Sequence, residues 1–342
     1  MDLIGNIDAY RDAGVSRDSA KTTVGFLSQL AKTTYDENVV EGVGGFGAIY
    51  RLNNSSDTLL VSSTDGVGTK SRISIALNEY ESLGHDVVNA CVNDVLTTGA
   101  KPLFFLDYIA AGRLISDNIE QIGIGIVNAC KISECSLIGG ETAEMPGIYS
   151  NEDIELVGFS VGVVSKNNLL KSSSVEVGDV LIGLPSSGVH TNGFSLIRNR
   201  LNLDDDSRPL KKYMSELKCE LGPALTIPHR PYYPLVKLIN GHIKNMAHIT
   251  GGGIIENLPR ALPSELCARV HLDSWEIPIL FNVLQDLMNV DKREMFRVFN
   301  MGIGMIVIAN DKEAKIIQSI LPEVFVMGEI EKRIKDEQVR FV

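Results

Sequence analysis

The chain has 342 residues, of which 44% are hydrophobic and 22% charged, a composition typical of folded globular proteins and not of disordered ones. Its formal net charge of −11 argues against a nucleic-acid-binding surface. No apolar run approaches the roughly 20 residues of a membrane span, and the N-terminus lacks the apolar core of a signal peptide. The five scattered cysteines form no CxxC pair, so we expect a reduced, cytoplasmic protein without a disulfide framework or a zinc site.

The first half of the chain is predicted to alternate strands and helices around glycine-rich turns. Strands are expected at 48–52, 58–62, 103–110, 136–138 and 154–164, and helices at 84–99 and 117–132. The helix at 84–99 has one continuous apolar stripe, and Gly99 stands where a C-cap glycine is expected.

A polar, turn-rich segment at 165–178 separates this half from the next. The second half is expected to have a strand at 179–184, a loop at 185–193, helices at 231–240 and 254–261, and a last α/β portion around 305–308. Both halves follow the plan of strand, glycine loop and helix. The sequence therefore predicts an α/β fold with two domains, residues 1–168 and 169–342.

The segment 42–47 (GVGGFG) formally matches the GxGxxG pattern of dinucleotide-binding folds. That pattern requires a strand before it and a helix after it, whereas here the preceding residues are polar and the following ones look like a strand. A dinucleotide site is therefore disfavoured. The remaining interpretations are a flexible segment that closes over a ligand and an ordinary turn.

The segment 64–70 (TDGVGTK) resembles half of a P-loop, but it lacks the glycine immediately before Lys-Ser, which excludes a Walker A site. Its glycines still permit close approach of a ligand to the backbone, and Lys70 is a candidate phosphate contact.

Two later glycine segments are candidates for binding as well. In GGETAEMPG (139–147), two carboxylates lie three residues apart in what we expect to be a loop after a buried strand; a capped helix start is the alternative. TGGG (250–253) precedes a helical pattern, which indicates either an anion site made of free amides or a plain helix-start turn.

The helix at 84–99 also carries a polar stripe of Asp86, Asn89, Asn93 and Asp94. A solvated face is the usual explanation, but such faces normally carry Lys and Glu. Short oxygen-bearing side chains suit Mg²⁺. Asp65, Asp94 and Glu141 all lie next to strand ends or glycine loops, so we expect them to converge on one cation.

His190 lies in SSGVHTNG (186–193), a polar loop between a strand and a helix. We expect it to be more exposed than a core histidine, which makes it a candidate acid, base or phosphate ligand. The other five histidines have no comparable setting and stay unassigned.

Several of these segments occur together, in order and at consistent spacing, along nearly the whole chain. They are YRDAGV (10–15), GGFGA (44–48), TDGVGTK (64–70), CVND (91–94), PLFFLDY (102–108), GGETAEMPG (139–147), SSGVHTNG (186–193), HITGGG (248–253) and FNMGIGM (299–305). The set resembles the phosphoribosylformylglycinamidine cyclo-ligase family. Selenophosphate synthetase and thiamine-phosphate kinase belong to the wider superfamily.

The resemblance implies a two-domain fold and a homodimer in which N-terminal strands pair across subunits. It also implies an enzyme of purine biosynthesis that uses ATP and Mg²⁺ to close an imidazole ring on formylglycinamidine ribonucleotide. Asp65, Asp94 and Glu141 would hold Mg²⁺–ATP, and His190 would assist catalysis and bind substrate.

Further roles follow from the resemblance. The nucleotide would be contacted by Gly44, Gly45, Phe46, Gly47, Gly66, Thr69, Lys70 and Gly140, with Asp65 and Lys70 also acting in catalysis. Substrate would be bound by Asn192, Gly251, Gly252 and Gly253, the glycines meeting its ribose phosphate.

The sequence also departs from the family. Around 228–232 the family often reads Pro-Thr-Arg-Ile-Tyr, whereas this chain has Pro-His-Arg-Pro-Tyr, in which Pro231 removes an amide donor. Met301 stands where the family often has Cys, and the first helical region has fewer basic residues than expected.

Two competing functions remain. A sibling kinase or synthetase of the superfamily would phosphorylate another acceptor, although the first 90 residues lack the cysteine that selenophosphate synthetase would need. A non-catalytic, nucleotide-binding dimer would bind ATP without releasing ADP. A dehydrogenase, which would bind NAD, is excluded by the setting of the GxGxxG segment.

Overall fold

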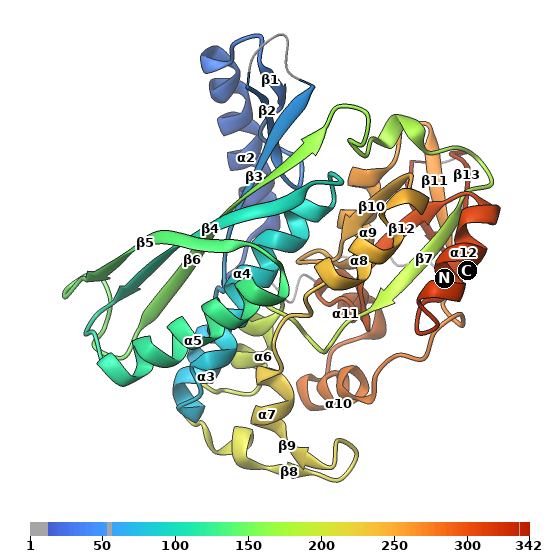
Figure 1. The fold of residues 1–342 in the computed structure, drawn as a ribbon. Helices are drawn as coiled ribbons and strands as arrows, with labels where there is room; N and C mark the ends of the chain where they lie inside the picture. The colour runs from blue at the N-terminus through green and yellow to red at the C-terminus, as the bar shows by residue number, and fades with distance from the viewer. Residues whose placement is uncertain (1–12, 53–56, 335) are drawn as a thin grey trace.

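The computed structural model describes residues 13–52, 57–334 and 336–342. Of the segment that resembles the family at 10–15, residues 10–12 lie outside this range. Two six-stranded sheets organise the described chain, one from each half (Figure 1). This is the expected α/β fold. The proposed boundary at 168/169 stays a prediction, and it falls between Ser165, the last residue of the first sheet, and Val180, the first of the second.

The first sheet is mainly antiparallel, in the order β1-β2-β3-β6-β4-β5, with β4 and β5 parallel. Its strands are β1 (Val39–Glu41), β2 (Ala48–Arg51), β3 (Thr58–Gly66), β4 (Lys101–Ala111), β5 (Ser136–Glu144) and β6 (Ile154–Ser165). Four helices belong to this half: α2 (Arg17–Ala31), α3 (Lys70–Leu77), α4 (Glu81–Leu96) and α5 (Ser116–Ile132), and a short 3₁₀ turn η1 (Lys32–Thr34) follows α2.

Helices α4 and α5 cover one face of this sheet (Figure 1). The reason is the apolar stripe of α4: Val87, Val88, Cys91 and Val95 are all fully buried, as the sequence pattern predicts. The helix ends as expected, because Gly99 has a φ of +80°, which a glycine adopts without strain.

The second sheet has the order β10-β12-β7-β13-β11-β14. Its strands are β7 (Val180–Pro185), β10 (Asn245–His248), β11 (Leu266–Val270), β12 (Ile303–Ala309), β13 (Phe325–Lys332) and β14 (Val339–Phe341). The helices are α6 (Phe194–Arg200), α7 (Leu221–Thr226), α8 (Tyr233–Ile239), α9 (Gly253–Asn257), α10 (Ile279–Met288), α11 (Lys292–Val298) and α12 (Asp311–Ile320). The remaining short elements are η2 (Ser172–Ser174), η3 (Arg208–Lys211), η4 (Asn240–His242), η5 (Leu258–Ala261) and the hairpin β8 (Tyr213–Met214) and β9 (Cys219–Glu220).

Alternate residues of the second sheet enter two different hydrophobic cores. Leu181 and Ile306 pack with α6, α10 and α11, whereas Ile182 and Val307 face the other way. This second core also contains the buried residues of α4 and α5, so one hydrophobic cluster spans both halves. The two halves therefore share a core, and a site between them has rigid walls.

The structure corrects one predicted element of the first half. The residues Gly139–Glu144, expected as a loop or a helix start, continue β5 as an exposed edge strand. The strand at 58–62 is also longer than expected and runs to Gly66, which places Asp65 inside β3. Both differences decide where carboxylates point, because side chains alternate between the two faces of a strand.

Candidate functional site

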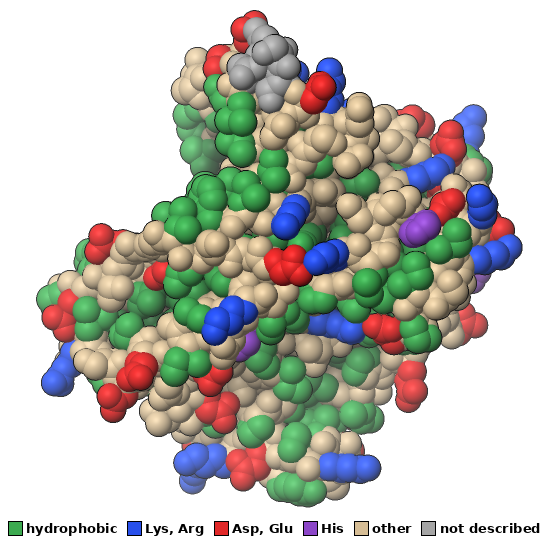
Figure 2. Space-filling model, viewed as in Figure 1, with side chains coloured by type: hydrophobic (Ala, Val, Ile, Leu, Met, Phe, Trp, Pro, Cys, Tyr) green, Lys and Arg blue, Asp and Glu red, His purple; other side chains and the backbone are tan. Residues whose placement is uncertain are grey.

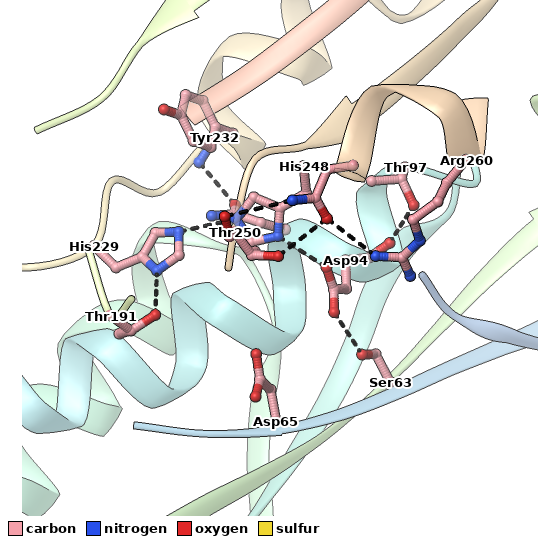
Figure 3. A network of polar contacts seen from close by, with 12 residues as sticks. Ser63, Asp65, Asp94, Thr97, Thr191, His229, Tyr232, His248, Thr250 and Arg260 are labelled. Atoms are coloured by element: carbon pink, nitrogen blue, oxygen red, sulfur yellow. Dashed lines mark hydrogen bonds and ion pairs between the residues drawn. The ribbon is translucent and has the colours of Figure 1, made fainter. Parts of the chain in front are cut away.

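The C-terminal end of α4 brings Asp94 to the junction between the halves. Its Oδ2 accepts a hydrogen bond from Ser63 Oγ on β3 at 3.2 Å, and its Oδ1 lies 2.8 Å from His248 Nδ1 on β10 (Figure 3). The Asp94 side chain keeps 15% of its surface exposed, whereas that of His248 has none. Asp94 is thus a carboxylate that faces both domains and still reaches solvent.

Asp65 lies beside Asp94, on β3 (Figure 3). Burial, and then the negative charge of Asp94, raise its pKa to about 6, against the opposing effects of the Gly66 N–H, which donates at 2.8 Å, and of His248. Two neighbouring carboxylates that share no cation repel each other. A divalent cation at this point would remove that repulsion.

Glu141 does not join this pair within one chain. The register aligns Asp65, Gly158, Asp107 and Gly140 in one row across the sheet, so these residues share the face under α4. Glu141 belongs to the next row and faces the opposite side, three strands from Asp65, roughly 14 Å at 4.8 Å per strand. Among the described residues no group of three acidic, histidine or cysteine side chains is placed to hold a metal. The expected convergence on one cation is therefore limited to Asp65 and Asp94.

Lys70 was expected to contact a phosphate of the ligand. Instead, its side chain points into the protein interior. Its ammonium is completely buried, lies 2.8 and 3.0 Å from the carboxylate oxygens of Asp86, and donates to the carbonyl of Ile227 at 2.9 Å. Burial lowers its pKa, and Asp86 acts in the opposite direction. This lysine joins α3, α4 and the chain after α7, which is a structural position.

The rest of the polar stripe on α4 holds the segment 228–232 by its backbone. Asp86 accepts from the His229 N–H at 2.7 Å, and Asn89 donates to the His229 carbonyl at 2.6 Å. Asn93 donates to the Arg230 carbonyl at 3.0 Å and accepts from the Tyr232 N–H at 3.1 Å. For these three residues neither a solvated face nor a cation site is correct. None of the four bonds uses the amide that Pro231 lacks, so this departure is accommodated.

His190 is buried, with 1% of its surface exposed, so the expected exposure is wrong. Its backbone has a φ of +64°, a conformation that costs a non-glycine residue roughly 1 kcal/mol or more. Its Nε2 accepts from the Ser187 N–H at 3.2 Å, which places the ring proton on Nδ1, and Nδ1 has no hydrogen-bond partner in the described part of the chain. Burial holds its pKa well below the usual value, so the ring is neutral.

Two histidines that sequence reasoning left unassigned complete the site. His229 stacks on His190, with ring centroids 4.0 Å apart and an interplanar angle of 20°. Its Nε2 lies 3.0 Å from Nε2 of His248. His248 was recognisable, because it opens the glycine-rich HITGGG segment; His229 carried no such signal.

The glycine segments lie around this centre. Phe46 stacks against the Arg260 guanidinium at 3.5 Å from the ring centroid, so the turn at 42–47 packs on the second half. Arg260 is also attracted to Asp94 and Glu41. Asn192 lies against Gly251, where an added Cβ would come within 3.1 Å of its Oδ1. The predicted substrate residues Asn192 and Gly251 are thus neighbours in space.

The helix after TGGG is short: α9 has five residues, and Gly252 and Gly253 both have positive φ. Asn257 donates to the carbonyls of Gly251 and Gly253 at 3.0 and 2.9 Å and fixes the turn. These bonds give the turn a structural explanation. An anion site there stays a prediction.

A cleft of about 580 Å³ opens beside Asp65. Its wall includes Gly66 and Thr69, two of the predicted nucleotide contacts, and two arginines, Arg72 and Arg198. Arg72 is paired with Asp153, and Arg198 with Asp204. Gly140 lies outside this cleft, on the exposed edge strand.

Both halves match known protein families. Residues 44–164 match AIR synthase related protein, N-terminal domain, and residues 176–338 match its C-terminal domain. A phosphoribosylformylglycinamidine cyclo-ligase of Thermoanaerobacter sp. (strain X514) is 45% identical over 326 residues, 94% of this chain and 97% of that protein. The chain belongs to the phosphoribosylformylglycinamidine cyclo-ligase family.

Other members of the cyclo-ligase family are equally similar. The protein of Caldicellulosiruptor bescii is 46% identical over 330 residues (94% of this chain, 97% of that protein), and that of Bacillus cereus (strain B4264) 44% identical over 320 residues (92% of each). Asp65, Asp94, His190 and His248 all lie inside the two matched domains.

Solved structures with low sequence identity share the fold. AaThiL complexed with AMPPCP and TMP gives a TM-score of 0.63 at 14% identity and covers 93% of this chain and 92% of that one. T. maritima PurL complexed with ADP gives 0.56 at 18% identity and covers 90% of this chain and 45% of that one. In the described residues no helix is long and apolar enough to cross a membrane.

Proposed function

We propose that this protein is the ATP-dependent cyclo-ligase that converts formylglycinamidine ribonucleotide to aminoimidazole ribonucleotide, with ADP and phosphate, in purine biosynthesis. Family membership over 94% of the chain supports the reaction. The observation on which this proposal mainly rests is the position of Asp94. Its carboxylate interacts with Asp65 on one side and with the buried histidine His248 on the other. A phosphate-activating acid pair and a ring-closing site would thus lie within contact of each other.

The reaction has two chemical steps. The substrate's formyl oxygen attacks the γ-phosphorus of ATP: an O–P bond forms, the β–γ bridge breaks, and ADP leaves. The amidine nitrogen then attacks the activated carbon, the C–N bond closes the ring, and the C–O bond breaks to release phosphate while the nitrogen loses a proton. Such reactions depend mainly on positioning and on stabilisation of charge.

Mg²⁺ fits the acid pair. Magnesium sites typically use one or two carboxylates together with substrate phosphates and water, and Asp65 and Asp94 supply two. Their mutual repulsion, expressed in the raised pKa of Asp65, would be relieved by a cation. When bound, Mg²⁺ would neutralise charge on the phosphates.

The remaining residues receive roles by position. Gly44, Gly45, Phe46 and Gly47, with Gly66 and Thr69, would contact the nucleotide, because the turn at 42–47 packs beside Asp94 and the others line the cleft next to Asp65. Asn192 and the glycines 251–253 would contact the substrate. His190, neutral and fixed, would orient or donate to it. Lys70 would act at a distance by holding α3 against α4.

We extend the proposal to a cytoplasmic homodimer. The face of the first sheet opposite α4 exposes Tyr50 and Phe159 by 42% and 41%, and α2 exposes Phe26 by 60%. Hydrophobic side chains gather over this part of the surface in Figure 2. A second copy would cover them. Glu141 and Gly140 would then lie at or near the interface, which is where we place their nucleotide role.

A coupled assay tests the function. The protein is incubated with formylglycinamidine ribonucleotide, ATP and Mg²⁺, and ADP release is followed together with formation of the aminoimidazole product. Equal amounts of both are expected. ADP without ring closure would indicate a sibling kinase or synthetase, and ATP binding without turnover a regulatory dimer; each of these results contradicts the proposal.

A further inference from the structure

His229 lies in the segment 228–232, and its ring lies at the centre of the candidate site. All of its surface is buried. The ring contacts His190 on one face and His248 at its edge, and Nδ1 lies 3.5 Å from Thr191 Oγ1 (Figure 3). These three contacts together restrict the orientation of the His229 ring.

The backbone of His229 is held just as firmly. Its N–H donates to Asp86 and its carbonyl accepts from Asn89, both on α4. The ring therefore projects from a clamped point of the second half toward a strand of the same half. Because both bonds are made to α4, the backbone of His229 is fixed relative to that helix.

The contact between His229 and His248 requires a defined proton arrangement. At 3.0 Å, one of the two Nε2 atoms must donate and the other must accept. Oδ1 of Asp94 accepts from Nδ1–H of His248. The Nε2 atoms of His248 and His229 then share one hydrogen between them, which joins the two rings edge to edge.

Nδ1 of His229, on the other side of the ring, lies 3.5 Å from the Thr191 hydroxyl. Thr191 precedes Asn192, the predicted substrate contact, whose Nδ2 lies 3.5 Å from Thr191 Oγ1. A continuous chain of polar contacts then runs from the loop at 186–193 through both histidines to Asp94.

We propose that His229 is a positioning residue of this chain: its ring links His190 and His248 into one rigid unit and fixes the orientation of both relative to Asp94. The proposal rests on the cyclo-ligase function only for its kinetic test. A shorter side chain without a ring, such as threonine, could supply neither the stack on His190 nor a hydrogen bond to Nε2 of His248 from this backbone position.

Two substitutions separate the hydrogen bond from simple packing. His229→Phe keeps a ring that can stack on His190 but leaves Nε2 of His248 without its hydrogen-bond partner. His229→Gln loses the stack but retains an amide that can donate to His248. His271→Gln, a half-exposed histidine paired with Glu329, is the matched control.

The kinetic readout is the division between kcat and KM in the coupled assay. We expect His229→Phe to lower kcat by roughly 10- to 100-fold with KM within about twofold, since displacement of a catalytic group acts on the transition state. His229→Gln should recover kcat to within about fivefold of the unmodified protein. An unchanged kcat in His229→Phe, or equal losses in the two variants, would overturn the proposal.

A second readout does not depend on catalysis or on variants that fold. In ¹⁵N-histidine-labelled protein, we expect a scalar coupling across the N–H···N bond between Nε2 of His229 and Nε2 of His248, and one tautomer for each ring. Absence of the coupling, or mixed tautomers, would overturn the proposal even if the enzyme closes the ring. Presence of the coupling in a protein without cyclo-ligase activity would instead refute the proposed function alone.

Discussion

Helix α4 carries two carboxylates, Asp86 and Asp94, whose surroundings differ. Asp86 is completely buried and is neutralised by Lys70. Asp94 is partly exposed and has another carboxylate, Asp65, as its neighbour. A compensated buried charge holds parts of the protein together, whereas two neighbouring like charges raise the free energy of the folded state and are retained where a ligand relieves them.

The largest effect expected is on activity, at Asp94. Asp94→Asn removes one charge of the acid pair and weakens the bond that orients His248, so we expect kcat to fall by roughly 10²- to 10³-fold. The coupled ADP-release assay measures this. Asp311→Asn, on the exposed start of α12, is the control and should leave kcat unchanged. If Asp94→Asn kept a tenth or more of the activity, the assignment of Asp94 would be wrong.

The next effect is on stability, at the compensated pair. Lys70→Met leaves the Asp86 charge buried without its cation, and we expect a loss of about 3–5 kcal/mol in the free energy of unfolding. Urea unfolding monitored by circular dichroism checks this. Lys315→Met, which breaks the exposed pair with Asp311, should change the free energy by less than about 0.5 kcal/mol. If the two variants lost similar amounts of unfolding free energy, the buried Lys70–Asp86 pair would contribute no more to stability than the exposed Lys315–Asp311 pair, and the prediction would be wrong.

A third prediction concerns Asp65, whose removal should stabilise the protein. Its pKa in the folded state is about 6, above the ordinary value of 3.8, so the folded protein binds this proton more tightly than the unfolded chain. The resulting stability is present below about pH 4 and is lost as pH rises through about 6. Without Mg²⁺, the free energy of unfolding of Asp65→Asn should therefore exceed that of the unmodified protein by about 3 kcal/mol at pH 7.5 and by little at pH 4.

Thermal unfolding at the two pH values measures this difference. Addition of Mg²⁺ and an ATP analogue should raise the melting temperature of the unmodified protein more than that of Asp65→Asn, because only the former has both carboxylates. A variant less stable than the parent at pH 7.5 would show that Asp65 is a compensated charge, like Asp86.

The smallest effect is expected at Arg260, the cation that faces Asp94 from the second half. Arg260→Lys keeps the charge but loses the planar stack on Phe46, a contact worth about 0.5–2 kcal/mol. We expect the turn at 42–47 to loosen and KM for ATP to rise about threefold, with kcat nearly unchanged. Arg208→Lys, at an exposed site, is the control. An unchanged KM for ATP would show that the turn at 42–47 does not contribute to nucleotide binding.

Much of the fold could be predicted from local patterns. The apolar stripe of α4 and the glycine that ends it are local features, and the predicted helix at 84–99 lies within three residues of the observed bounds at each end. The segment at 139–144 was misread because two glycines and polar residues normally indicate a turn. Pairing with β4 makes it an edge strand instead, and this pairing is not visible in the local sequence.

The site was less predictable, because the sequence does not show which group a polar side chain will bind. Asp86, Asn89 and Asn93 have the composition of a cation site, yet they bind the backbone of residues 229–232, more than 130 positions away along the chain. His190 is surrounded by polar residues in sequence but by histidine and tyrosine rings in space. Distant contacts of this kind decide whether a polar group binds a ligand or the protein itself.

The hydrogen bonds between α4 and the segment 228–232 affect which substitutions this segment can accept. Helix α4 recognises main-chain atoms of residues 229, 230 and 232, which every amino acid presents except for the amide that proline lacks, and residue 231 contributes none. Side chains at 229 and 231 are thereby free to drift while the two halves stay joined. The side chain at position 229, in the middle of the candidate site, can therefore change without the loss of any of these main-chain bonds to α4.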